Sequence, residues 1–141
     1  MTLKTRHVLN ILAQDGYALS QPAFNDWINS GVVSPRLVVG RNGSEYRFTL
    51  KDVARARLVA RLRREGIPLQ RIRPALAYLD RKLNTVLEPG TRASLIVEPG
   101  GHRAIIVEQP GKAALEVPSG QLRLQLSEVV IDRETAAKFA A

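Results

Sequence analysis

Apolar residues recur every three or four positions through the first half of the chain, and this period predicts helices. Phe24, Trp27 and Ile28, for example, would form one buried stripe. Ser20 is a suitable N-cap for that helix, and Gly31 is a natural residue just beyond its end. The helices predicted in this way cover residues 5–14, 20–30, 50–65 and 68–83.

A change of period marks the stretch between the second and third predicted helices. Two short β-prone runs, residues 37–39 and 46–48, lie on either side of Asn42-Gly43. Asn-Gly is a strong signal for a tight turn. The pattern therefore predicts a β-hairpin that projects as a wing.

The last two predicted helices differ in their faces. The third has a small-aliphatic face toward a core and an arginine face opposite it. The fourth has heptad-like spacing, for which core packing is favoured over pairing between two copies, and Pro74 is expected to kink or split it. The aliphatic face of the third helix comprises Val53, Ala56, Val59 and Leu62, and its arginine face comprises Arg57, Arg61 and Arg64. The heptad-like positions of the fourth helix are Leu69, Ile72, Leu76, Leu79 and Leu83.

Beyond Pro89-Gly90 the period of the apolar positions changes to two, which predicts strands. Proline and glycine turn signals separate them, so we expect a small antiparallel β-meander of about four strands, closed by a helix near residues 127–139. The fold class is α+β, with one domain at residues 1–87 and a β-rich module at residues 91–141. About fifty residues is marginal for an independent core, so this module is expected to lean on the first domain or on a copy of itself.

Charge changes the picture because it is unevenly spread. Residues 1–87 hold 15 Lys and Arg against 6 Asp and Glu, whereas residues 88–141 hold 6 against 7. The net charge of +8 therefore belongs to the first half. A basic half joined to a neutral one favours a polyanion-binding domain, although a solubilising surface is the plain alternative.

Composition excludes several classes of protein. The chain has no cysteine, so disulfides and thiolate metal sites are excluded. No apolar run approaches the length of a membrane span and no signal-peptide pattern is present, so we expect a cytoplasmic, nucleoid-associated protein without a membrane partner. His7 and His102 lie in no metal-ligand spacing, and no phosphate-binding loop occurs. The expectation is a protein that is not an enzyme and needs no cofactor or metal.

Several short motifs follow one another in a fixed order between residues 18 and 83. They are Trp27 to Val33 with its central Gly31, Pro35-Arg36, Tyr46-Arg47, Thr49 to Val53, and Gly66-Ile67-Pro68-Leu69. Together they resemble the DNA-binding domain of the mercury-resistance (MerR-type) regulators. That resemblance implies a winged helix-turn-helix of four helices and a hairpin wing, and binding to double-stranded DNA.

The chain departs from the family pattern at three places. Its first turn, at residues 15–19, is longer than usual, and Asn25-Asp26 stand where the family usually has Arg-Tyr. Family members usually dimerise through a long helix that follows the fourth, and Pro89-Gly90 would end such a helix here. The usual dimer and ligand sensing are therefore not implied.

The candidate base-reading residues lie on the exposed face of the second predicted helix. Gln21, Asn25 and Asn29 recur at intervals of four. Asn and Gln side chains can form two hydrogen bonds with adenine in the major groove. Polar residues on a solvated helix face are the alternative reading of the same pattern.

The candidate phosphate contacts come from the wing and from the start of the third helix. A helix N-terminus favours anions, and an arginine at a glycine-flanked tip can enter a narrow minor groove. The arginine face of the third helix would either extend this footprint or pair with acids of the second module. The candidates are Arg36, Arg41, Asn42, Arg47 and Lys51.

The sequence therefore predicts a sequence-specific, double-stranded DNA-binding transcriptional regulator of bacterial or phage origin. It is expected to act as a homodimer, with the C-terminal module mediating self-association or binding a protein partner. An excisionase-like or architectural DNA-binding protein of a mobile element, and an antitoxin-like protein-interaction module, remain the alternatives.

Overall fold

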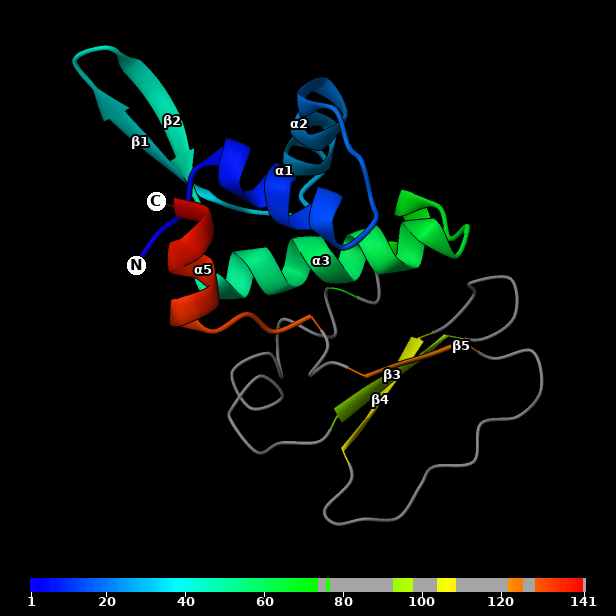
Figure 1. Cartoon of the computed structure of the whole chain (residues 1–141). Helices are drawn as coiled ribbons and strands as arrows, with labels where there is room; N and C mark the ends of the chain where they lie inside the picture. Colours follow the sequence, from blue (N-terminus) through cyan, green and yellow to red (C-terminus); the bar gives the residue numbers. More distant parts are fainter. Residues whose placement is uncertain (74–75, 77–92, 98–103, 109–121, 126–128, 141) are drawn as a thin grey trace.

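The computed structural model describes residues 1–73, 76, 93–97, 104–108, 122–125 and 129–140 (Figure 1). Three of the predicted helices are confirmed within two residues at each end, and residues 69–73 and 76 of the fourth are also helical. The predicted hairpin is present between the second and third helices. The bounds are α1 Thr5–Gln14, α2 Gln21–Asn29, β1 Arg36–Gly40, β2 Gly43–Arg47 and α3 Leu50–Arg64.

Local capping explains where α2 and α3 begin. The Ser20 hydroxyl accepts the backbone N–H of Ala23 at 3.3 Å, as the sequence predicts for an N-cap. Thr49 and Asp52 form a reciprocal capping box at α3, with distances of 3.2 and 2.8 Å. Both starts are therefore fixed by side chains close in sequence.

The aromatic core holds α2 against the base of the hairpin. The Phe24 ring lies 5.9 Å from Trp27 and 5.6 Å from Phe48, measured between ring centroids, and all three side chains are buried. Leu3 forms an isolated β-bridge with Phe48 through two backbone hydrogen bonds of 2.8 Å. The chain start, α2 and the end of the hairpin thus share one core.

α3 is the central helix of this core, as Figure 1 shows. Its predicted aliphatic face is confirmed as buried, and the burial extends to Ala54, Leu58 and Ala60. Ile72 and Leu76 are each 1% exposed, so this part of the heptad-like spacing serves core packing. Pro74, Leu79 and Leu83 lie outside the described residues.

The wing, residues 36–47, is a regular antiparallel hairpin that projects away from the helices (Figure 1). Arg36 pairs with Arg47 at its base, and Gly40 pairs with Gly43 at its tip. Gly43 has φ of 104° while the turn residues before it have negative φ, so the left-handed conformation falls on the glycine. The Asn-Gly turn signal is confirmed.

Three strands are described in the second half: β3 Ala93–Val97, β4 Ala104–Glu108 and β5 Leu122–Gln125. They pair antiparallel in the order β4-β3-β5, so the strand order of a meander is wrong. The sequence interval between β4 and β5 exceeds a tight hairpin, which allows β5 to pair with the far edge of β3. The predicted strand at residues 114–117 lies outside the described residues.

The predicted terminal helix is present as α5, Arg133–Ala140, and begins later than expected, because residues 129–132 are not helical and Asp132 caps its start. The Asp132 carboxylate accepts the backbone N–H of Thr135 at 2.7 Å, and this bond is the main cause of its lowered pKa. α5 packs against α1, as Figure 1 shows. Val129, Ile131 and Ala136 are buried in the same core as α1 and α3, so this segment adds to the helical core.

Candidate nucleic-acid interface

A surface hollow of about 350 Å³ lies where α1, α2 and β2 meet. Gln21 and Asn25 line it from the first two turns of α2, and Tyr46 lines it from the wing. Two of the three predicted base-reading residues therefore share one concave surface with the wing. The lining residues are Lys4, Thr5, Arg6, Gln21, Asn25, Ser44, Glu45 and Tyr46.

Asn29 lies outside this hollow. It is the last residue of α2 and is exposed, one helical turn beyond Asn25. Trp27, which stands between them in sequence, is 3% exposed and packs in the core. α2 consequently divides into an aromatic inner face and an amide-bearing outer face, as its sequence predicts.

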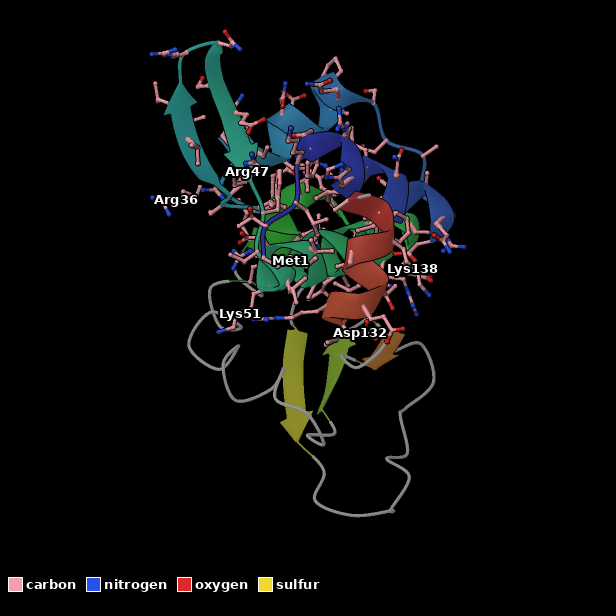
Figure 2. The ribbon with its side chains drawn as sticks, turned by 60° about the vertical axis from the view of Figure 1, so that its left-hand side comes forward. Met1, Arg36, Arg47, Lys51, Asp132 and Lys138 are labelled. Carbon is pink, nitrogen blue, oxygen red and sulfur yellow. The ribbon has the colours of Figure 1, made fainter. Side chains whose placement is uncertain are left out.

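The base of the wing brings Arg36 and Arg47 together as cross-strand partners, and Figure 2 shows both at that base. Arg47 Nη2 lies 2.6 Å from Glu45 Oε1, and Lys4 Nζ lies 3.9 Å from the other oxygen of that carboxylate. Sequence reasoning missed Glu45, because its proximity to Lys4 depends on a tertiary contact. An acid thus already engages one of the predicted phosphate-binding arginines.

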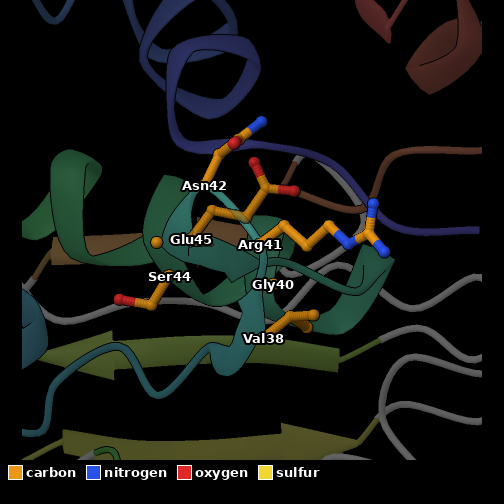
Figure 3. Close-up of a pocket in the computed structure, with 7 residues that line it drawn as sticks. Val38, Gly40, Arg41, Asn42, Ser44 and Glu45 are labelled. Atoms are coloured by element: carbon orange, nitrogen blue, oxygen red, sulfur yellow. The ribbon is translucent and has the colours of Figure 1, made fainter.

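The tip of the wing carries Arg41 and Asn42, both exposed. Their side chains extend from the tip in different directions (Figure 3). They line a shallow hollow with Val38, Ser44 and other wing residues. Nothing within 4 Å would meet a Cβ at Gly43, so the glycine serves backbone conformation there.

Lys51 lies apart from these groups. It is exposed in the first turn of α3, and Figure 2 shows it well below Arg47 and the wing. The structure therefore brings the wing and α2 residues to one side of the domain and separates Lys51 from them.

Two arginines on the predicted arginine face of α3, Arg57 and Arg64, form hydrogen bonds within the protein. Arg57 Nε and Nη2 donate to the Asp15 carboxylate at 2.7 and 3.2 Å, and Nη1 lies 3.1 Å from the Val129 carbonyl oxygen. Arg64 Nη1 donates to the Asp15 carbonyl at 3.1 Å. The acidic partner of Arg57 is thus Asp15 at the end of α1 rather than an acid of the second module, which Arg57 contacts through the backbone carbonyls of Val129 and Val130.

The start of α1 contributes three residues to the hollow that, like Ser44 and Glu45 of the wing, were not singled out by the sequence: Lys4, Thr5 and Arg6. The available signal was a pair of cations flanking the start of a short helix just before the helix-turn-helix motifs. Such a position offers free backbone N–H groups beside positive side chains. The hollow is therefore more basic than the second helix and the wing alone suggest.

His7 fixes the start of α1 beneath this surface. Its side chain is 7% exposed, and Nδ1 accepts the backbone N–H of Lys4 at 3.0 Å, which requires a neutral ring. Burial of the imidazole, and then the charges of Arg6, Lys4 and Arg47, lower the pKa of His7 below 6.5. Protonation would add a buried charge and break the cap.

Lowering the pH should therefore destabilise the domain through His7. A folded-state pKa below the unfolded value gives stability that is complete above pH 6.5 and is lost as pH falls through the folded pKa. Urea unfolding midpoints between pH 7.5 and 5.5 should fall for the wild type and stay flatter for His7→Gln. A wild-type slope in His7→Gln would contradict the assignment.

Other site chemistries find little support in the described part of the chain. Among those residues there is no group of three His, Cys, Asp or Glu arranged to hold a metal ion. No helix of that same part is both long and apolar enough to cross a membrane.

A comparison with protein families identifies the helix-turn-helix and wing. Residues 19–79 match the model of the family described as MerR HTH family regulatory protein. That segment contains α2, the wing, α3 and the helical residues 69–73 and 76. It is a MerR-family domain.

The MerR assignment confirms the resemblance drawn from the motifs. The protein is a DNA-binding, non-enzymatic transcriptional regulator with a MerR-type helix-turn-helix. α1 and the segment from residue 80 onward lie outside the matched range. No curated protein matches the chain.

Proposed function

We propose that this regulator reads duplex DNA with the outer face of α2 in the major groove and the wing on the adjoining backbone. The observation that carries the proposal is the shared hollow, in which Gln21 and Asn25 lie beside Lys4, Arg6 and the wing. Amides that reach base edges need cations beside them to fix the register on the phosphates. The hollow supplies both.

In this proposal Gln21, Asn25 and Asn29 contact base edges. Their spacing of four residues places them along one face of α2, and the inner face of that helix is sealed by Phe24 and Trp27. A bidentate amide–adenine pair contributes about 1–3 kcal/mol of discrimination against a wrong base.

The phosphate contacts are assigned to the wing and to α3. Arg36 and Arg41 are exposed, whereas Arg47 is held by Glu45 and must exchange that carboxylate for a phosphate. Asn42 at the tip and Lys51 at the start of α3 complete the set as outer contacts. Lys51 would then meet the backbone at a distance from the wing.

We further propose that two copies bind together, with residues 91–141 supplying self-association or a protein contact through the part that precedes Val129, since the residues from Val129 onward pack in the core shared with α1 and α3. One domain with one short reading helix spans few base pairs, and two half-sites raise affinity by linking two binding events. The same proposal includes the predicted division of the chain into a DNA-binding domain, residues 1–87, and a second module, residues 91–141. Titration of a palindromic duplex should then saturate at two chains per duplex.

Two substitutions separate the roles assigned to the wing and to α2. Arg41→Ala should weaken binding to all duplexes alike and reduce the log–log salt slope by about one, because one phosphate contact is lost. Asn25→Ala should reduce the preference for a duplex selected from a random library over a scrambled one by about tenfold, with less change in salt slope. Mobility-shift titrations across a salt series measure both quantities.

Arg133→Ala is the matched control, because Arg133 is an exposed arginine on α5, outside the hollow and the wing. It should leave affinity and salt slope close to wild type. If both Arg41→Ala and Asn25→Ala bind duplex DNA like the wild type, with the same affinity, preference and salt slope, the placement of the interface is wrong.

A further inference from the structure

The first strand of the wing, β1, exposes three consecutive aliphatic side chains. Leu37, Val38 and Val39 are 52%, 38% and 78% exposed, and Val39 is the most exposed large hydrophobic side chain among the described residues. The core valines Val32 and Val33, a few positions earlier, are fully buried. Contiguous exposed apolar surface of this kind commonly marks an interaction site.

β1 is also the outer edge strand of the wing. Within the part of the chain that the structure describes, the wing is a two-stranded sheet in which β1 pairs with β2 alone. Figure 1 and Figure 2 both show β2 toward α1 and α2, and β1 on the side of the wing away from those helices. An edge strand directs the N–H and C=O groups of alternate residues outward, so β1 offers backbone groups with which a further strand can pair.

The two edges of the wing differ in chemistry. β2 carries Glu45 and Arg47, which form an ion pair at 2.6 Å, and Lys4 lies 3.9 Å from the same carboxylate. β2 also lines the hollow assigned to DNA, whereas no residue of β1 does. Charged side chains on an edge oppose the addition of another strand, and the three central residues of β1 carry none. β1 is therefore the edge that can accept a strand while DNA occupies the hollow.

β1 is complementary to itself when two copies run antiparallel about Val38. In that register Val38 lies opposite Val38 of the second copy, and Leu37 lies opposite Val39, with the two kinds of pair on opposite faces. Each Arg36 lies opposite Gly40, which has no side chain. The two Arg36 positions are about 14 Å apart along the strands, beyond the Debye length of about 8 Å at physiological salt. The register thus joins aliphatic side chains and separates the two Arg36 charges.

We infer that β1 is a pairing edge for β1 of a second copy, so that two wings join into one four-stranded sheet in the order β2-β1-β1-β2. A second copy is the occupant because the strand matches its own reverse in side-chain size and in charge spacing, as a two-fold contact requires. The inference rests on the proposal that two copies act together and adds a contact to it. One strand pair is small, so it acts on copies already linked by residues 91–128 or by one duplex, where their effective concentration is high.

Single cysteines test the pairing in a chain that has none of its own. Val38→Cys should form a disulfide-linked dimer under mild oxidation about tenfold faster than Ser44→Cys, because two Val38 positions lie directly opposite, with about 4.5–5.5 Å between their Cβ atoms. Ser44 is the matched control, since it is exposed on β2, the other strand of the same wing. The rates are measured on the full chain, with and without a palindromic duplex, and urea unfolding confirms that each variant keeps its fold.

The antiparallel register is tested by mixing two variants. Leu37→Cys and Val39→Cys in equal amounts should form mixed dimers in excess of the statistical share, because position 37 lies opposite position 39 of the second copy and diagonal to its own counterpart. Mass spectrometry distinguishes the mixed dimer from the two dimers of a single variant. A statistical mixture of the three products would overturn the inference.

The outcomes for the pairing edge and for the proposed function are distinguishable. Equal linking rates for Val38→Cys and Ser44→Cys, both with and without duplex, would overturn the pairing edge. If two wild-type chains still bind each palindromic duplex in that case, the proposed function stands and the contact between copies lies elsewhere. Selective linking of Val38→Cys by a protein that binds no duplex would keep the pairing edge and sink the proposed contact with DNA.

Discussion

Phe24→Ala should lower the free energy of unfolding by about 3–5 kcal/mol, the range found for truncation of a buried phenylalanine. Phe24 is fully buried and contacts the rings of both Trp27 and Phe48. It therefore joins α2 to the end of the wing, the two elements that carry the candidate interface. The truncation should also abolish duplex binding at temperatures where the wild type binds.

Urea unfolding and mobility shifts on the same preparations measure the two effects. Phe24→Leu keeps most of the volume and should cost less than the alanine variant, with duplex binding retained. Ala23→Ser, one position earlier on a half-buried side of α2, should lie near wild type in both. A wild-type unfolding midpoint in Phe24→Ala would show that the ring is not part of the core.

Arg57→Ala should destabilise the protein by about 2 kcal/mol and release the segment that precedes α5. The Arg57 side chain is 18% exposed and that of Asp15 is 30% exposed, so their ion pair is only partly screened by solvent. The same guanidinium donates to the carbonyls of Val129 and Val130 at 3.1 and 3.3 Å. Hydrogen bonds to a charged group contribute about 1.5–3 kcal/mol, and partial exposure of the acceptors places the expected loss inside that range rather than above it.

Hydrogen exchange locates that effect in the chain. Protection of amides in residues 129–140 should fall in Arg57→Ala, and much less in Arg64→Ala, which loses a single exposed hydrogen bond to Asp15. Combining Arg57→Ala with Asp15→Ala should cost less than the sum of the two single changes, because they remove one shared interaction. Strict additivity, or unchanged exchange in residues 129–140, would contradict the proposed tie.

Most of the local structure could be predicted because its causes are local. Ser20 and the capping box of Thr49 fix helix starts through contacts three residues apart. Asn42-Gly43 fixes the turn of the wing through backbone conformation. Such features depend on neighbours in sequence, so the pattern contains the information that determines them.

The candidate site was predictable in part for the same reason. The face shared by Gln21 and Asn25 follows from helical period alone, and both residues line the hollow. The contribution of Lys4 and Arg6 depends on α1 packing beside the wing, and so does the proximity of Lys4 to Glu45. The contacts that these residues make with DNA stay predictions, which the mobility-shift titrations described above would test.

By itself the sequence determined the helices of the first half, the wing, the concentration of positive charge and the MerR-type motifs, since each depends on short-range periodicity or composition. Only the tertiary structure decided that Arg57 ties Asp15 to the carbonyls before α5 and that β3 lies between β4 and β5. These outcomes join residues far apart in the chain. Many pairings satisfy the same local pattern at such separations, and only the complete packing selects among them.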